Sequence, residues 1–325
     1  MPGVSRIFVR LPNWVGDVCM CLPALELLAA SGAALTLCGR PWARELLAGL
    51  PEHDFVPMRG RLREDRRAVR ERVRRLDRGG RAGARGLLLP DSLSSAAVFR
   101  LAGLRSAGYR DDGRSLLLRW PLAKPDRPVH AVESWYGLAR TALQRWGCDP
   151  GPQRPADRLA LPLTPAHRQA ADRLLDEAGL RAGAFVLIAP TATGLHRGRV
   201  KVWPHFDALA RALQARGQEV AMCPPPAETG AARGNAPTAR LLPSLPLGAF
   251  AALTARAGLV ICNDSGVSHI AAAAGARQIT LFGVTRPGRS GPWTPDAVCL
   301  GREDAWPDMR TVERQAMALL DAAHG

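Results

Sequence analysis

The most constraining feature of the sequence is a regular alternation of two kinds of segment. Short apolar runs rich in β-branched residues alternate with longer segments in which apolar residues recur at helical spacing. This alternation is typical of repeated βα units, in which helices cover a sheet of parallel strands. The sequence therefore predicts the α/β class with parallel sheets.

In the first half of the chain, strands and helices are expected in turn. We expect strands at Arg6–Arg10, Ala34–Cys38, Phe55–Met58, Gly86–Pro90 and Ala107–Tyr109. We expect helices at about Val15–Ala30, Arg63–Arg78, Ser94–Leu101 and Ala131–Trp146.

The second half continues the same pattern. We expect strands at Ala184–Ala189, Gln218–Cys223, Leu259–Cys262 and Gln278–Phe282. We expect helices at His167–Ala178, Phe206–Arg216, Leu247–Ala257, Gly266–Ala274 and about Asp308–Ala323.

A proline-rich segment separates the two halves. Residues 148–165 contain five prolines, which remove backbone donors and resist both helix and strand. At 325 residues the chain is also longer than a typical single core. We therefore predict two α/β domains joined by this linker, with a cleft between them where ligands bind.

The charge of the chain favours anionic partners. The formal net charge is +15, which suits nucleic acid, an acidic membrane surface or phosphorylated substrates. Residues 59–85 hold twelve arginines and four acidic residues, a local balance of +8. This segment fits a solvated helix and an anion-docking surface equally well. Nucleic-acid binding is not expected, because no helix-turn-helix, zinc-finger, KH or RRM signature accompanies the segment.

Cysteine and lysine usage add two expectations. The seven cysteines show no C-x-x-C spacing, which indicates reduced, mostly buried thiols and a cytosolic protein. No leader segment and no run of about 18 apolar residues occurs, so we expect no membrane span. Of the 44 basic residues only Lys124 and Lys201 are lysine, which indicates that these positions need a compact ammonium, although two lysines also fit chance.

The first candidate site lies in RLPNWVGDVCMCLPALELL, residues 10–28. A strand ends near Arg10 and a helix follows, so Asp17 lies at the carboxyl end of a strand, where open α/β sheets place ligands. The alternative is that Asp17 only caps the helix. Spacing alone leaves both open.

The second candidate site is the loop after the strand that ends at Ala189. The hydroxyls of Thr191 and Thr193, the loop amides and the ammonium of Lys201 could together neutralise a phosphate. The segment is not a Walker A loop, because the order G-x-x-x-x-G-K-[ST] is absent. An exposed basic loop without a ligand is the alternative.

The third candidate site is ICNDSGVSHIAAAAG, residues 261–275, which places Asp264, Ser265, Ser268 and His269 close together. A hydrolase elbow needs G-x-S-x-G, and neither serine fits. One histidine and one aspartate are too few for zinc. A strand, a turn and a helix remain, so the free amides at the helix start form a candidate anion site. A plain N-cap with a buried histidine fits equally well.

Four segments together resemble one family, the ADP-heptose:lipopolysaccharide heptosyltransferases of glycosyltransferase family 9, and most closely its heptosyltransferase II branch. They occur in the family's order and cover both halves: LPNWVGDVCMCLPAL, LLLPDSLSSAAVFRLAG, KVWPHFDALARAL and NDSGVSHIAAAAGARQITLFGVTRP. The GD pair and the D-[ST]-G-x-x-H motif are modestly specific alone and specific in combination.

The resemblance implies a GT-B fold, in which two Rossmann-like domains with parallel sheets face each other across a cleft. Residues 1–155 would bind the acceptor and residues 156–325 the nucleotide-sugar donor, with packing of the last helix on the N-terminal domain left open. The implied reaction is an inverting, metal-independent transfer of heptose from ADP-heptose to a hydroxyl of the lipopolysaccharide inner core. No cofactor is implied.

The resemblance also assigns the catalytic residues. Asp17 would be the general base that takes the proton of the acceptor hydroxyl. Lys201 would pair with the donor diphosphate and stabilise the leaving ADP. Thr191 would bind phosphate through its hydroxyl, although a long loop from Thr193 to Val200 leaves the choice between the two threonines open.

The remaining donor residues follow from the same family pattern. Ser265 and Gly266 would supply backbone amides to the phosphates, Asp264 would bind heptose hydroxyls, and His269 would line the pocket. Glu228 falls where the family has a ribose-binding carboxylate, and Leu245 where a backbone contact meets the adenine.

Two segments depart from the family pattern. CPPPAE, residues 223–228, carries prolines where a glycine-containing loop is common, so the base preference stays open. GVTRPGR, residues 283–289, adds arginines near the expected sugar site.

The arginine-rich segment gains a role from the resemblance. In this family a basic segment of the N-terminal domain faces a phosphorylated glycolipid at the cytoplasmic face of the inner membrane. The expected acceptor-binding residues are Arg59, Arg61, Arg63, Arg66 and Arg67. We therefore expect a cytoplasmic protein that binds this membrane peripherally. A glycosyltransferase for another acceptor, a protein or a different glycan, and a non-catalytic nucleotide-sugar-binding protein are the alternatives.

Overall fold

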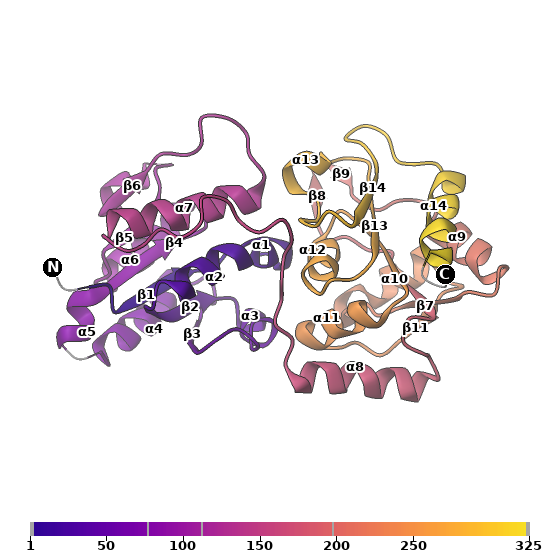
Figure 1. The fold of residues 1–325 in the computed structure, drawn as a ribbon, viewed down its shortest axis with the longest axis horizontal. Coiled ribbons are helices and arrows are strands. Elements are labelled where there is room, and N and C mark those ends of the chain that lie inside the picture. The colour runs from indigo at the N-terminus through magenta and orange to yellow at the C-terminus, as the bar shows by residue number, and fades with distance from the viewer. Residues whose placement is uncertain (1–2, 77, 112, 197, 323–325) are drawn as a thin grey trace. The chain divides into compact units, whose positions relative to one another are not determined.

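The computed structural model describes residues 3–322 except residues 77, 112 and 197. The chain divides into two compact units, Met1–Ala156 and Asp157–Gly325. Each unit is built around one six-stranded sheet with helices around it (Figure 1). The division falls inside the proline-rich segment.

The sheet of the first unit has the order β3-β2-β1-β4-β5-β6, and every neighbouring pair is parallel. Its strands are β1 Arg6–Arg10, β2 Ala34–Gly39, β3 His53–Pro57, β4 Ala84–Leu88, β5 Ser106–Tyr109 and β6 Trp120–Leu122. The strand order changes direction between β1 and β4, and ligands of open α/β sheets bind at such a switch point.

Helices cover both faces of this sheet. They are α1 Val15–Met20, α2 Leu22–Ala30, α3 Pro41–Leu46, α4 Leu62–Arg74, α5 Arg78–Gly83, α6 Leu93–Leu101 and α7 Ala131–Arg145, with a 3₁₀ turn η1 at Arg114–Leu117. Phe8 of β1 shares a core cluster with Val69 of α4 and Phe99 of α6. Side chains alternate along a strand, so the buried Ile7 and Val9 point toward the other face, on the side of α2 and α7.

The sheet of the second unit repeats the arrangement, with the order β11-β10-β7-β12-β13-β14 and parallel pairing throughout. Its strands are β7 Phe185–Ala189, β10 Glu219–Met222, β11 Arg240–Leu241, β12 Leu259–Asn263, β13 Gln278–Phe282 and β14 Ala297–Gly301. The switch point lies between β7 and β12.

The helices of the second unit again form two layers. They are α8 Pro165–Ala178, α9 Phe206–Gln214, α10 Thr229–Asn235, α11 Leu247–Arg256, α12 Gly266–Ala273, α13 Pro287–Ser290 and α14 Met309–Asp321, with a 3₁₀ turn η2 at Pro226–Glu228. One core cluster joins α9 and α14 to the sheet through Phe206, Leu209 and Val312. On another side α11 packs against α8 and α12. A short hairpin, β8 Leu195–His196 and β9 Arg199–Val200, lies in the loop after β7.

The two ends of the linker are fastened to different units. In the first unit the carbonyl of Pro152 accepts hydrogen bonds from the Tyr136 hydroxyl at 3.0 Å and from Nε of Arg140 at 3.2 Å. In the second unit the amides of Leu159 and Leu161 donate to the backbone at 3.0 and 2.8 Å. The residues between these anchors form the connection.

Several expected boundaries need correction. The helix predicted for Val15–Ala30 is two helices that meet at Cys21, because Pro23 has no N–H to donate to the preceding turn. The helix predicted for Arg63–Arg78 ends at Arg74, and α5 is a separate helix. The strand predicted for Gly86–Pro90 begins two residues earlier. The last residue of the predicted C-terminal helix, Ala323, lies outside the described residues.

The cysteines of the chain form no disulfide. All seven are free, and Cys19, Cys21, Cys38, Cys223 and Cys262 are buried, whereas Cys148 is half-buried and Cys299 is exposed.

The last helix, α14, packs against α9 of its own unit, and its packing on the first unit stays a prediction. In the described part of the chain, no helix is both long and apolar enough to span a membrane.

Candidate functional site

In the second unit, the residues expected to bind the donor gather at the carboxyl edge of the sheet. Each lies in a loop or helix start that follows a strand: β7, β10, β11 or β12. These residues are Thr191, Thr193, Lys201, Glu228, Leu245, Asp264, Ser265, Gly266 and His269. Most follow β7 or β12, the two strands that border the switch point. The edge where parallel sheets bind ligands therefore carries the motif residues.

Asn263 at the end of β12 joins the two loops beside the switch point. Its side chain is buried, its Oδ1 accepts from the amide of Trp203 at 2.9 Å, and its Nδ2 donates to the carbonyls of Ala189 and Thr191 at 3.3 Å each. Trp203 is itself buried, and its indole N–H donates to the carbonyl of Pro307 at 2.8 Å. The long loop after β7 is therefore held at both of its ends.

Lys201 brings a positive charge to the first turn of α12. Its ammonium donates to the carbonyl of Asp264 at 3.1 Å, next to the amides that open the helix. By helix geometry the first amides have no acceptor inside the helix, and the helix dipole adds partial positive charge there. The ammonium and the helix start together favour an anion such as a phosphate.

The Asp-Ser-Gly turn can serve both as a helix cap and as an anion site. Ser265 is the N-cap of α12, and its hydroxyl accepts from the amide of Val267 at 3.3 Å. The hydroxyl of Ser268 donates to the carbonyl of Ser265 at 2.8 Å, which ties it to its own helix. The Ser265 hydroxyl therefore caps the helix, and the amides that open α12 lie in the same turn as the carbonyl that Lys201 contacts.

Asp264 and His269 are nearly inaccessible, with 7% and 4% of their surfaces exposed. The Asp264 carboxylate accepts from the hydroxyl of Thr285 at 2.6 Å. Thr285 follows β13, so a third strand of the sheet fixes the orientation of this carboxylate. The nearby Arg286 forms an ion pair with Glu303, which offsets the charge that this arginine adds to the loop.

A hydrogen bond links the loops after β7 and β10. The hydroxyl of Thr191 donates to the carboxylate of Glu228, so these groups occupy adjacent positions. Thr193 is exposed, and the loop around it folds back through the β8–β9 hairpin. The guanidinium of Arg199 ties that hairpin to the carbonyl of Gly283 at 3.1 Å.

In the first unit Asp17 is the third residue of α1, directly after β1 at the switch point. The N-cap position belongs to Trp14, and Asp17 is the acidic residue of the first turn of this helix. The loop before it is rigid, because the buried guanidinium of Arg10 donates to the carbonyl of Leu11 and to Oδ1 of Asn13 at 2.8 Å. Burial lowers the pKa of Arg10.

Asp17 also acts on the neighbouring thiols. Burial and then the negative charge of Asp17 raise the pKa of Cys19 to about 12, and the same two causes raise the pKa of Cys21. Both thiols therefore stay protonated at neutral pH, and neither is a nucleophile.

The expected acceptor arginines lie on the loop after β3 and on the start of α4. Arg59, Arg61, Arg63 and Arg67 are exposed and Arg66 is half-buried. The buried carboxylate of Asp65 holds the loop by accepting from the amides of Arg59 at 2.7 Å and Gly60 at 2.9 Å. These side chains are open to solvent in the structure, where an anion can reach them.

Residues 73–319 match the family model described as glycosyltransferase family 9 (heptosyltransferase). The chain belongs to glycosyltransferase family 9. This confirms the family that the sequence motifs resembled, and it makes the protein a glycosyltransferase.

Three known proteins illustrate the similarity. The family 9 chain is 27% identical over 325 residues to lipopolysaccharide heptosyltransferase 2 of Escherichia coli, covering 87% of this chain and 84% of that protein. The solved ADP-heptose lipopolysaccharide heptosyltransferase II of E. coli matches with a TM-score of 0.75 at 24% identity, over 98% of this chain and all of that one. An E. coli heptosyltransferase solved with ADP matches with a TM-score of 0.74 at 20% identity, over 97% and 99% of the two chains.

These comparisons and the topology confirm the expected fold class. Both units have the Rossmann-like strand order, and the two solved structures named above are heptosyltransferases of the GT-B fold. Among the described residues no group of three or more His, Cys, Asp or Glu side chains is placed to hold a metal ion.

Sequence reasoning missed the residues that organise the site. Asn263, Thr285 and Arg10 bind no expected ligand, yet each fixes a loop that carries a motif residue. Asn263 and Thr285 lie inside the quoted family segments. The signal that was overlooked for Asn263 is a polar residue at the end of an apolar strand. The expected donor residues lie together in one unit, and Asp17 and the arginines lie in the other.

Proposed function

We propose that this family 9 glycosyltransferase transfers heptose from ADP-heptose to a hydroxyl of the lipopolysaccharide inner core, with inversion at the anomeric carbon. The observation that carries the proposal is the contact of the Lys201 ammonium with the Asp264 carbonyl at the start of α12. It supplies a cationic site for the diphosphate of the donor, in a family whose named relatives transfer heptose.

The donor would lie along the carboxyl edge of the second sheet. Lys201, the amides of Ser265 and Gly266 and the hydroxyl of Thr191 bind the diphosphate. The carboxylate of Glu228 is adjacent to that hydroxyl and binds the ribose. Ribose next to phosphate is the order in which a nucleotide presents these groups.

The remaining donor-binding residues would contact the heptose and the adenine of ADP-heptose. Asp264, oriented by Thr285, accepts hydrogen bonds from heptose hydroxyls. His269 lines the same pocket, and the backbone at Leu245 contacts the adenine. Thr193 contributes if the exposed loop closes on the phosphates.

Asp17 is the general base of the proposed reaction. Its carboxylate accepts the proton of the acceptor hydroxyl while that oxygen forms a bond to the anomeric carbon. The bond from this carbon to the β-phosphate oxygen breaks on the opposite side, and ADP leaves with the electron pair. Lys201 and the start of α12 stabilise the charge that develops on ADP, so the reaction proceeds without a metal ion.

The acceptor would be a phosphorylated glycolipid on the cytoplasmic face of the inner membrane. Arg59, Arg61, Arg63, Arg66 and Arg67 bind its anionic groups and the anionic leaflet around it. Attraction of about 1 kcal/mol per basic residue near such a surface suffices for peripheral binding.

Replacement of Asp17 tests the proposed chemistry. We expect Asp17→Asn to bind ADP-heptose with unchanged affinity and to lose transfer by roughly 10²–10⁴-fold, because the amide cannot accept the proton. Calorimetry measures the binding, and mass spectrometry of a defined core acceptor measures the product. Near-normal turnover would exclude Asp17 as the base.

A matched variant separates the roles of the two units. Lys201→Ala should weaken binding of ADP itself, whereas Asp17→Asn should not. Product on a protein or another glycan, with none on any core acceptor, would favour a different acceptor. Tight binding of ADP-heptose without any product would favour a non-catalytic binding protein.

A further inference from the structure

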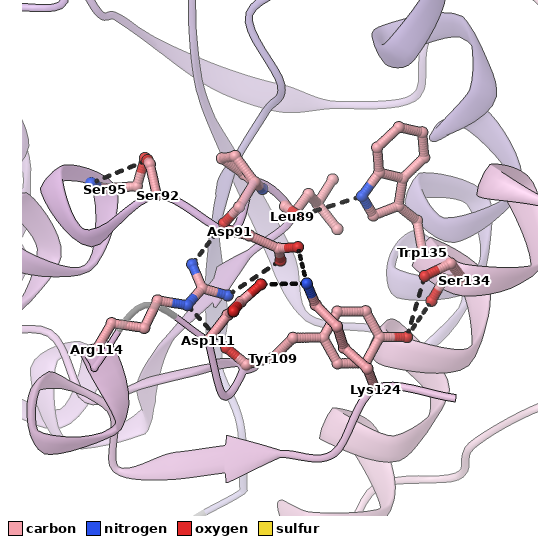
Figure 2. A network of polar contacts seen from close by, with 11 residues as sticks. Leu89, Asp91, Ser92, Ser95, Tyr109, Asp111, Arg114, Lys124, Ser134 and Trp135 are labelled. Atoms are coloured by element: carbon pink, nitrogen blue, oxygen red, sulfur yellow. Dashed lines mark hydrogen bonds and ion pairs between the residues drawn. The ribbon is translucent and has the colours of Figure 1, made fainter. Parts of the chain in front are cut away.

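Three neighbouring strands of the first sheet end in one polar cluster. Asp91 follows β4, Asp111 follows β5 and Lys124 follows β6, and Figure 2 shows their side chains converging. The Lys124 ammonium lies 2.8 Å from the Asp91 carboxylate and pairs also with Asp111. These three side chains, the Asp91–Asp111–Lys124 cluster, stay partly open to solvent, with 39%, 37% and 44% of their surfaces exposed.

The buried guanidinium of Arg114 contacts the loop that carries Asp91. Arg114 has no exposed side-chain surface, and it donates to the carbonyls of Tyr109 at 2.7 Å and Pro90 at 2.6 Å. It also approaches the Asp91 carboxylate at 3.4 Å. Gly108 leaves room for this group, because a Cβ there would come within 3.1 Å of the guanidinium. The loops after β4 and β5 are therefore locked together.

Helix α7 holds the same loops from another side. The indole N–H of Trp135 donates to the carbonyl of Leu89 at 3.1 Å, and the hydroxyl of Tyr109 donates to the carbonyl of Ser134 at 2.5 Å (Figure 2). The exposed carboxylates and ammonium therefore rest on a rigid base, which is the arrangement of a preorganised binding site.

The cluster lies beside the switch point of the first sheet. The amide of Leu89 donates to the carbonyl of Arg10 at 3.2 Å, so the loops after β4 and β1 begin side by side at the edge of the sheet. Asp17 stands on the loop and helix after β1 and Asp91 on the loop after β4. The loop that carries Asp91 therefore leaves the sheet next to the loop that leads to Asp17, at the carboxyl edge where open α/β sheets bind ligands.

The net charge of the Asp91–Asp111–Lys124 cluster and of Arg114 favours an uncharged ligand over an anionic one. Two carboxylates, one ammonium and one guanidinium sum to zero, so a phosphate would gain nothing here and would meet two negative groups. The carboxylates accept hydrogen bonds, and the ammonium has three donors, of which the two carboxylates engage two. Neighbouring hydroxyl groups of a sugar donate and accept in this way. The Lys124 pKa is raised by the hydrogen bonds to Asp111 and Asp91, which keeps the ammonium charged.

We propose that the Asp91–Asp111–Lys124 cluster is a sugar-binding subsite that takes neutral hydroxyl groups of the acceptor glycan next to its reacting hydroxyl. The inference rests on the proposed function. It divides acceptor recognition between two parts of the same sheet edge. The arginines after β3 bind anionic groups, and the cluster binds uncharged ones.

The test measures acceptor and donor kinetics of Asp111→Asn and Lys124→Met in the full chain. We expect each variant to raise the KM for the core acceptor about tenfold or more, because a hydrogen bond to a charged group is lost. The KM for ADP-heptose, the affinity for ADP and the melting temperature should stay at wild-type values. Asp91→Asn is a poorer probe, because that carboxylate also contacts the buried Arg114.

Matched controls lie at the opposite edge of the same sheet. Glu52 directly precedes β3 and Arg105 directly precedes β5, and both side chains are exposed. Glu52→Gln and Arg105→Met remove the same charges there and should leave the acceptor KM unchanged. Acceptors that lack single hydroxyls give the decisive comparison, since loss of the contacted hydroxyl should weaken wild type and not weaken Asp111→Asn further.

Each outcome has a distinct meaning. A wild-type acceptor KM in both variants, or equal losses for donor and acceptor, overturns the subsite and leaves the proposed function intact. A lower melting temperature with an unchanged acceptor KM identifies a purely structural ion cluster. Absence of product from wild type with every core acceptor overturns the proposed function and the subsite together.

Discussion

Asn263 binds no expected ligand, yet its buried side-chain amide positions the loops of the candidate donor site. Its oxygen serves the amide of Trp203, and its nitrogen serves two carbonyls on the far side of the loop after β7. An amide is the side chain that both donates and accepts, so neither leucine nor aspartate of similar size can replace it. Lys201 lies two residues from Trp203, and the position of its ammonium depends on this link.

Replacement of Asn263 should therefore weaken the fold and the donor site together. We expect Asn263→Ala to lower the free energy of unfolding by about 2–4 kcal/mol, because buried donors and acceptors lose their partner. Affinity for ADP should fall as well. Urea unfolding and calorimetry measure the two effects. The control is Gln214→Ala, which removes one exposed hydrogen bond, and equal effects of the two variants would contradict this role.

At the scale of helices and strands, the central elements were predictable and the edges were not. The predicted bounds of β1 and β13 match the structure residue for residue, because both strands are buried runs with a clear start and end. The missed strands are short or lie at sheet edges: β6, β8, β9, β11 and β14. Such strands carry too few consecutive apolar residues to differ from loops.

The same contrast applies to the candidate site. The residues expected to touch ligands follow predictable strands, so the sequence could place them at one sheet edge. The residues that hold them could not be found in this way. Thr285 contacts Asp264 across 21 positions of sequence, and Asn263 contacts Trp203 across 60. Only the folded sheet brings these pairs together.

The start of α4 illustrates an element whose position depends on one carboxylate. Asp65→Ala should lower the free energy of unfolding by about 1–3 kcal/mol, since two backbone amides lose their acceptor. The acceptor KM should also rise, because the loop that carries Arg59 loses its anchor. Glu64→Gln is the neighbouring control, and removal of its exposed ion pair with Arg61 should leave the free energy of unfolding nearly unchanged, because solvent screens exposed ion pairs. A large effect of both variants would point to the helix dipole instead.

At the scale of the whole molecule, the uneven charge should decide where the protein binds in the cell. We expect the chain to bind vesicles that contain anionic lipid and to dissociate as salt rises, because screening weakens surface attraction. Replacing Arg59, Arg61, Arg63 and Arg67 by glutamine should abolish this binding and leave ADP affinity unchanged. Sedimentation with vesicles measures the first property and calorimetry the second.

A control with the same net charge separates position from total charge. Four exposed arginines of the second unit, Arg173, Arg181, Arg310 and Arg314, can be replaced in the same way. Equal loss of vesicle binding in both variants would show that net charge alone, and not the segment after β3, attracts the protein to the bilayer.

The distribution of the seven thiols would allow the natural chain to be labelled at one cysteine in each unit. Five thiols are buried, and burial raises the pKa of Cys19, Cys38 and Cys262 to about 12, so thiol reagents at neutral pH will not modify them in the folded protein. Cys148 of the first unit is half-buried and Cys299 of the second is exposed, and because burial raises the pKa of Cys299 to about 11, labelling of this thiol needs alkaline pH. A pair of spin labels or dyes on these two positions would record the distance between the units as donor and acceptor bind, without any engineered cysteine.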